Sequence, residues 1–130
     1  MNKNFRPFIT TAICAVIIFL LTFYFYNIAG SSGFIISNCV LYAVLGVLIG
    51  RVWSVYPWQI GLIASLPGWI FTAWRFFARN EEIPDIALNV SLFYWHPILS
   101  MIASYVGTYF GRWLAFRQKK ARSTDAEEKE

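Results

Sequence analysis

The longest charge-free stretch of this chain is the feature that most restricts its fold. Residues 7–50 contain no Asp, Glu, Lys or Arg. A soluble domain of this size needs polar faces on its elements, because much of its surface remains in water. Charged residues make up only 14% of the sequence, whereas a soluble domain has about 25%. The sequence therefore predicts an integral membrane protein.

Several apolar segments are long enough to cross a bilayer as helices, which takes about 20 residues each. They cover approximately residues 8–28, 33–53, 58–78 and 88–113. We expect an all-α integral membrane protein, a four-transmembrane-helix bundle with short loops. It would form one domain over residues 1–116, followed by a charged, mobile cytoplasmic tail over residues 117–130.

The distribution of Lys and Arg predicts the orientation of the bundle. One side of the membrane would collect eight basic residues: Lys3, Arg6, Arg51, Arg112, Arg117, Lys119, Lys120 and Arg122. The opposite side would carry only Arg75 and Arg79. Because basic residues favour the cytoplasmic side, both termini are expected in the cytoplasm.

The basic cluster indicates contact with anionic lipid headgroups rather than nucleic acid. A bacterial inner (cytoplasmic) membrane is the expected location. If residues 8–28 were a cleaved signal, three spans would remain.

Small residues recur at steps of four, three and four in three of the segments, which keeps them on one helix face. Small faces let helices approach closely in lipid. The predicted packing residues are Ala43, Gly46, Gly50, Gly61, Ser65, Gly68, Ser104, Gly107 and Gly111. We expect the second, third and fourth segments to form the tight core. The first segment would be more peripheral, and most bulky aromatic side chains would face lipid.

Two similar motifs, GVLIGRVW and GTYFGRW, end the second and fourth segments. Arg51 and Arg112 are expected to reach phosphate headgroups, and Trp53 and Trp113 to lie at interfacial depth. These four residues are the predicted lipid-headgroup anchors. The repetition fits two parallel helices, and selection for packing explains it more simply than an internal duplication.

Two residues interrupt the apolar segments. Pro67 cannot donate a hydrogen bond to the carbonyl of Ile63 and is predicted to kink the third segment. His96 lies near the outer end of the fourth segment and is interpreted as an interfacial histidine. Its alternative role is a metal or proton-sensing site with the acidic residues at positions 81–85.

The segments contain no Asp or Glu, and no Ser pairs with His or Lys at a comparable depth. Intramembrane catalysis and proton coupling usually need such groups. We therefore expect no catalytic, cofactor or metal site. The leading hypothesis is a non-enzymatic accessory, assembly or regulatory subunit that contacts another membrane protein or a second copy of itself. The alternative is an oligomeric channel or facilitator for a small solute, lined by Ser65, Thr72, Ser104 and Thr108.

Overall fold

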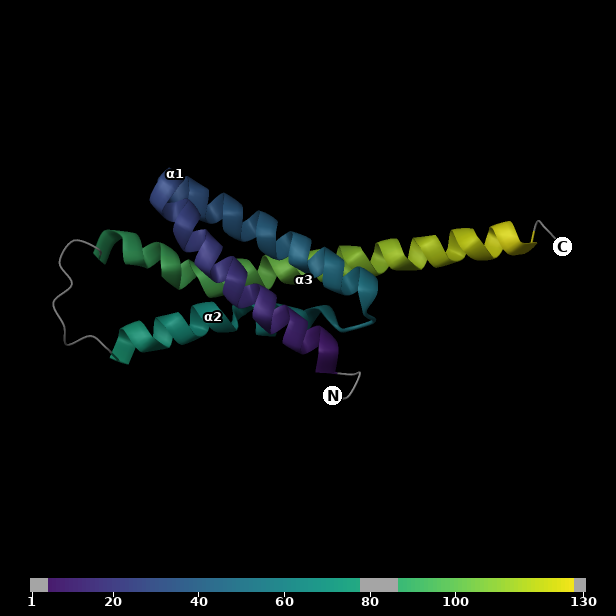
Figure 1. Cartoon of the computed structure of the whole chain (residues 1–130), viewed down its shortest axis with the longest axis horizontal. Coiled ribbons are helices and arrows are strands. Elements are labelled where there is room, and N and C mark those ends of the chain that lie inside the picture. Colours follow the sequence, from purple (N-terminus) through teal and green to yellow (C-terminus); the bar gives the residue numbers. More distant parts are fainter. Residues whose placement is uncertain (1–4, 78–86, 128–130) are drawn as a thin grey trace.

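The computed structural model describes residues 5–77 and 87–127. This part of the chain forms three helices: α1 (Arg6–Val52), α2 (Pro57–Phe77) and α3 (Ala87–Glu127). Figure 1 shows that α1 folds back on itself and that its two parts lie at an angle to α2 and α3. The fold is all-α, as the sequence predicts.

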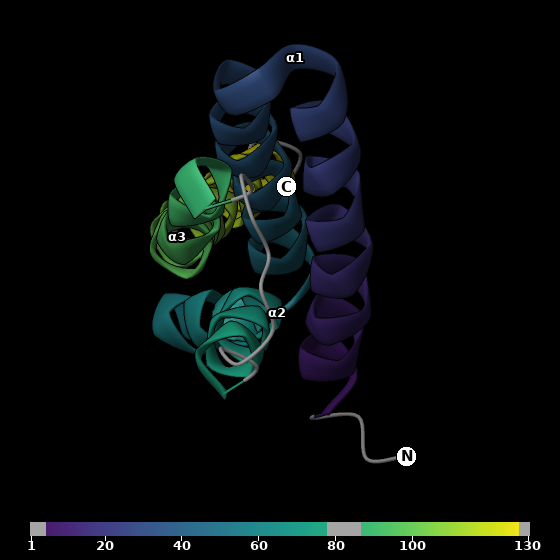
Figure 2. The ribbon, with the colours of Figure 1, turned by 90° about the vertical axis from the view of Figure 1, so that its left-hand side faces the viewer.

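The reversal of α1 occurs at Gly30. This residue has φ 63° and ψ −148°, a backbone conformation that is almost restricted to glycine. The reversal divides α1 into a first arm, residues 6–29, and a second arm, residues 31–52. The linker expected between the first two segments is thus reduced to one non-helical residue. Figure 2 shows the two arms running side by side below the turn.

Contacts between the arms show that they are antiparallel. The Tyr42 hydroxyl donates a hydrogen bond to the Ala15 carbonyl oxygen at 3.1 Å, and the rings of Tyr26 and Phe34 lie 6.4 Å apart next to the turn. The first arm is more peripheral than the second, as expected, with four buried residues against seven. Ala15 is fully buried, because its small side chain leaves room for the ring of Tyr42 against the first arm.

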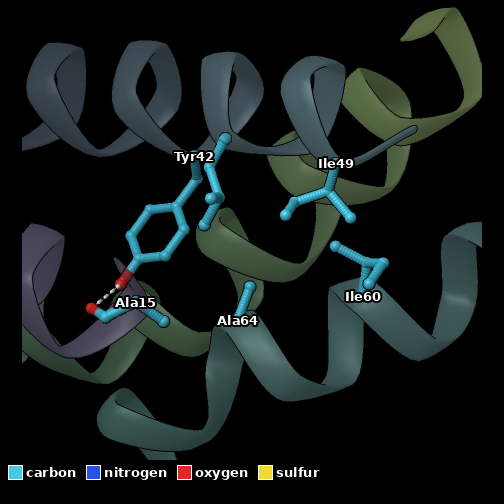
Figure 3. Close-up of a cluster of buried hydrophobic side chains, with 6 residues drawn as sticks. Ala15, Tyr42, Ile49, Ile60 and Ala64 are labelled. Atoms are coloured by element: carbon cyan, nitrogen blue, oxygen red, sulfur yellow. Dashed lines mark hydrogen bonds between the residues drawn. The ribbon is translucent and has the colours of Figure 1, made fainter. Parts of the chain in front are cut away.

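The hydrophobic core joins both arms of α1 to α2. Figure 3 shows Tyr42 and Ile49 of the second arm above Ile60 and Ala64 of α2. The buried cluster consists of Ala15, Tyr42, Leu45, Ile49, Ile60 and Ala64. Most large apolar side chains are exposed, but Phe34 and Tyr42 are fully buried. These two rings depart from the expectation that bulky aromatic residues face lipid.

The surface of α1 is apolar over most of its length. Among the described helices, α1 is the one long and apolar enough to cross a membrane, and only 17% of its most apolar window is buried. The core helix of a soluble protein would be mostly buried. A signal sequence near an N-terminus also contains an apolar helical segment of this kind.

The boundaries of α2 agree closely with the prediction, whereas the end of α3 does not. The segment expected at 58–78 is shifted by one residue in α2. In contrast, α3 does not end near Trp113 but continues to Glu127. Residues 117–127 of the expected tail are therefore helical, and the mobility and cytoplasmic location of the tail stay predictions. Figure 1 shows this end of α3 projecting beyond the other helices.

Candidate functional site: a buried polar centre

His96 lies in the interior of the bundle. Its ring exposes no surface. It contacts both arms of α1: the ring of Phe19 lies perpendicular to it at 4.7 Å between centroids, the ring of Tyr42 lies at 5.4 Å, and the ring of Phe34 lies at 6.1 Å. The imidazole is therefore enclosed by aromatic side chains from two antiparallel helical rods.

Asn38 belongs to the same region. It lies on the second arm one turn after Phe34 and one turn before Tyr42, so these three side chains share a helix face. Since the rings on either side both contact His96, this face of the arm is the one turned toward the imidazole. Asn38 exposes no surface. We call His96 and Asn38 together the polar centre.

The polar centre lacks hydrogen-bond partners within the described part of the chain. Neither Nδ1 nor Nε2 of His96, and neither Oδ1 nor Nδ2 of Asn38, has one. Leaving a buried polar group without a partner costs about 1–3 kcal/mol. Such groups are uncommon in folded proteins and often mark a functional site. Four unsatisfied atoms on two nearby side chains make this region the strongest candidate for function.

Helix-breaking residues surround the polar centre. A Cβ atom added at Gly68 of α2 would lie 2.5 Å from Nδ1 of His96 and 2.9 Å from Cδ of Pro97. Only glycine therefore allows α2 to approach α3 at this level. Pro67 and Pro97 lie inside their helices, and each removes the amide that would bond the carbonyl four residues earlier. The carbonyl groups of Ile63 and Phe93 therefore lack their usual amide donors within the helices.

The polar centre lies near the middle of α2. Gly68 comes eleven residues after the first residue of the helix, which is about 16 Å along its axis at 1.5 Å per residue. The burial of His96 inside the bundle is not apparent from the sequence, and its interfacial depth in a membrane stays a prediction. Its alternative acidic partners at positions 81–85 lie outside the described residues. The kink expected at Pro67 stays a prediction.

The hydroxyl groups expected to line a channel bond to their own helices. Ser65 donates to the carbonyl of Leu62 at 2.8 Å, and Thr72 donates to that of Gly68 at 2.8 Å. Ser104 donates to the carbonyl of Ser100, and Thr108 to that of Ser104 at 2.7 Å. Because these protons are already engaged, they are poorer candidates for binding a solute than the side chains of the polar centre.

The glycines of the first motif face α3. A Cβ atom added at Gly46 would collide with the carbonyl oxygen of Ser104, and one added at Gly50 would collide with that of Thr108. Ser104 and Thr108 are themselves fully buried. The second arm therefore packs directly against the backbone of α3, without intervening side chains.

The glycines of the second motif face back toward the second arm. A Cβ atom at Gly107 would collide with the carbonyl oxygen of Ala43, and one at Gly111 with that of Val47. The positions rise together along both helices, so the two are parallel at this contact. The two motifs thus form opposite sides of one seam inside the molecule. Gly61 of α2 lies against a different region, with a hypothetical Cβ 3.1 Å from the carbonyl oxygen of Met101.

The predicted anchors occupy different environments. Arg51 is exposed, and Trp113 is 42% exposed. Trp53 packs against the hydrophobic core. Arg112 donates a hydrogen bond from Nη1 to the carbonyl oxygen of Val55 at 3.2 Å, so it also ties α3 to the connection between α1 and α2. A role for these residues at lipid headgroups stays a prediction.

No protein-family model, curated protein or solved structure matches the chain. The described residues contain no group of three or more His, Cys, Asp or Glu side chains that could hold a metal ion. The chemical role of the polar centre therefore rests on its own geometry.

Proposed function

We propose that the chain is a multi-pass membrane protein of the bacterial inner membrane with four spans and both termini in the cytoplasm. The two arms of α1, together with α2 and the first part of α3, would provide the spans. Support comes from the charge-free sequence of residues 7–50, the exposed apolar surface of α1 and the uneven distribution of basic residues.

We further propose that this protein is a non-enzymatic channel or facilitator for a small polar solute. The observation that carries this proposal is the absence of hydrogen-bond partners for His96 and Asn38. Polar groups inside a membrane are costly and typically belong to pathways or binding sites. A solute that donates and accepts hydrogen bonds would satisfy both side chains while it passes between the helices.

The surroundings of the polar centre fit transient rather than permanent binding. Phe19, Phe34 and Tyr42 offer the solute only ring contacts around the imidazole, so few polar groups would hold it. The helices stay continuous at Pro67 and Pro97, but each proline leaves one carbonyl group without its usual amide donor, and a passing solute could bond to it. Passage would also require these rings to move, because His96 and Asn38 are fully buried.

The proposal is tested by solute flux into liposomes that contain the purified protein. Ammonium, urea, glycerol and formate form a suitable first panel. We expect at least one to enter faster than into protein-free vesicles, and Asn38→Leu or His96→Leu to abolish this difference. Ser104→Ala is the matched control, because that hydroxyl already bonds within α3. Entry equal to that of protein-free vesicles for the whole panel, or equal loss in the control, would contradict the proposal.

A second candidate function is the accessory, assembly or regulatory subunit. It is favoured by an apolar groove of about 310 Å³ between α2 and α3, lined by Trp58, Gly61, Leu62, Met101, Ile102 and Tyr105. Leu62 and Ile102 are 48% and 54% exposed, so a transmembrane helix of a second membrane protein could pack against them. Tagged protein extracted in mild detergent should then retain that partner in constant ratio, and Ile102→Asn should release it. Recovery of this chain alone, or as a homo-oligomer, would count against the candidate.

A further inference from the structure

A basic hollow lies where the end of α1 meets α3, away from the polar centre. Its volume is about 300 Å³, and the side chains that matter for its chemistry are Arg51, Ser54, Arg112 and Lys119. Three of these four carry a positive charge at neutral pH. The hollow is therefore a region of concentrated positive charge. It lies at the end of the bundle from which the C-terminal part of α3 extends.

The glycine seam brings the cations together. A Cβ atom at Gly111 would lie only 3.0 Å from the backbone nitrogen of Arg51, and Arg112 is the next residue along α3. Lys119 follows two turns later on the same helix face. Because glycine permits this close approach, two arginines from different helices line the same hollow. Lys119 also lines it.

One of the three cations is held in place by the protein. The guanidinium of Arg112 donates to the Val55 carbonyl at 3.2 Å, and its Cζ lies 5.9 Å from the ring centroid of Tyr56. Arg51 is exposed. One fixed and one freely accessible guanidinium allow an incoming anion to be bound without rearrangement of the seam.

Residues 5–77 and 87–124, which include every residue that lines the hollow, contain neither Asp nor Glu. The last carbonyl groups of α1 contribute only a partial negative charge, equivalent to about half an elementary charge. Three full positive charges outweigh this, and their mutual repulsion favours a bound anion.

We propose that the hollow binds a phosphate group. Guanidinium groups match phosphate through paired hydrogen bonds, and the Ser54 hydroxyl can donate a further one. The phosphate could come from the headgroup of an anionic lipid or from a soluble phosphorylated molecule, since both present the same oxyanion. This site is distinct from general attraction of a basic surface to the membrane, because it depends on residues that line one hollow.

The test compares charge removal inside and outside the hollow. Arg51→Gln and Lys119→Gln remove lining cations, whereas Arg117→Gln removes a cation that lies 4.4 Å over the Trp113 ring and does not line the hollow. Binding of dioleoylphosphatidylglycerol to the detergent-solubilised protein is measured by native mass spectrometry, and binding of inorganic phosphate by calorimetry. Thermal unfolding of each variant checks that the fold is intact.

We expect Arg51→Gln and Lys119→Gln each to weaken binding of at least one probe by about tenfold or more, and Arg117→Gln to change it little. A lipid headgroup is the source if the variants lose lipid binding while excess inorganic phosphate does not displace the lipid from the unmodified protein. Calorimetric binding of inorganic phosphate that depends on Arg51 identifies a soluble phosphorylated molecule. Equal effects of all three variants, or binding of neither probe, would overturn the proposal.

Discussion

At the scale of single residues, Asn38 allows stability and function to be separated. Its amide is buried without a hydrogen-bond partner, and leucine has a similar size without polar atoms. We expect Asn38→Leu to raise the free energy of unfolding of the solute-free protein by about 1 kcal/mol or more. Titration with SDS from mild detergent micelles, followed by circular dichroism, measures this change.

The same substitution at an exposed asparagine provides the control. Asn27 lies near the turn of α1 and is exposed, so Asn27→Leu should change the unfolding free energy by less. If Asn38→Leu were instead destabilising, the amide would have to make an interaction that stabilises the native fold. The assignment of Asn38 to a costly binding site would then fail.

At the scale of elements, the reversal of α1 depends on a single backbone conformation. A Cβ atom at Gly30 would meet nothing within 4 Å, but the residue has a positive φ. The cost of Gly30→Ala therefore arises from backbone strain alone, about 1–3 kcal/mol of unfolding free energy. SDS titration of this variant beside Ser31→Ala, an exposed neighbour, measures it. Equal stability of the two variants would show that α1 does not reverse through this conformation.

The seam between the second arm and α3 predicts a ranking of glycine substitutions. Alanine at Gly107 would collide with a backbone carbonyl of the second arm, whereas alanine at Gly61 would lie 3.1 Å from the carbonyl oxygen of Met101 and 3.4 Å from its flexible side chain. We expect Gly107→Ala to lower the unfolding free energy by about 1–3 kcal/mol.

Gly61→Ala should cost clearly less, because the nearest backbone atom lies at 3.1 Å rather than at a colliding distance and the methionine side chain can move aside. Unfolding free energies of both variants, measured in the same micelles, give the comparison. The opposite ranking would mean that the motifs do not pack against each other within one chain. In that case Gly46 and Gly50 would become candidates for contacts between chains.

At the scale of the whole molecule, the ends of the chain define a topology test. Figure 1 shows the start of α1 and the end of α3 at the same end of the bundle, as four crossings require. A fluorescent protein that folds only in the cytoplasm should therefore be bright when it is fused to either terminus. Alkaline phosphatase, which is active only outside the cytoplasm, should be inactive at both. An active phosphatase fusion at one terminus would exclude an even number of crossings.

Sequence patterns anticipated much of the helical arrangement and little of the polar centre. The apolar segments lie close to α2 and to the two arms of α1, since length and hydrophobicity are local properties. The end of α3 was misplaced because charged residues such as Lys119 and Lys120 end an apolar run without ending a helix. The burial of Ala15 in the first arm was not predicted, because Ile18 interrupts the small-residue pattern there.

The sequence by itself determined that this chain is helical and largely apolar, with its cations gathered in a few places, because composition and periodicity act within one segment at a time. Only the tertiary structure decided that the two glycine motifs meet each other and that Arg51 and Arg112 share a hollow. It also decided that His96 and Asn38 are buried together without partners. Burial and hydrogen bonding depend on atoms from several helices at once, and no pattern along a single helix specifies them.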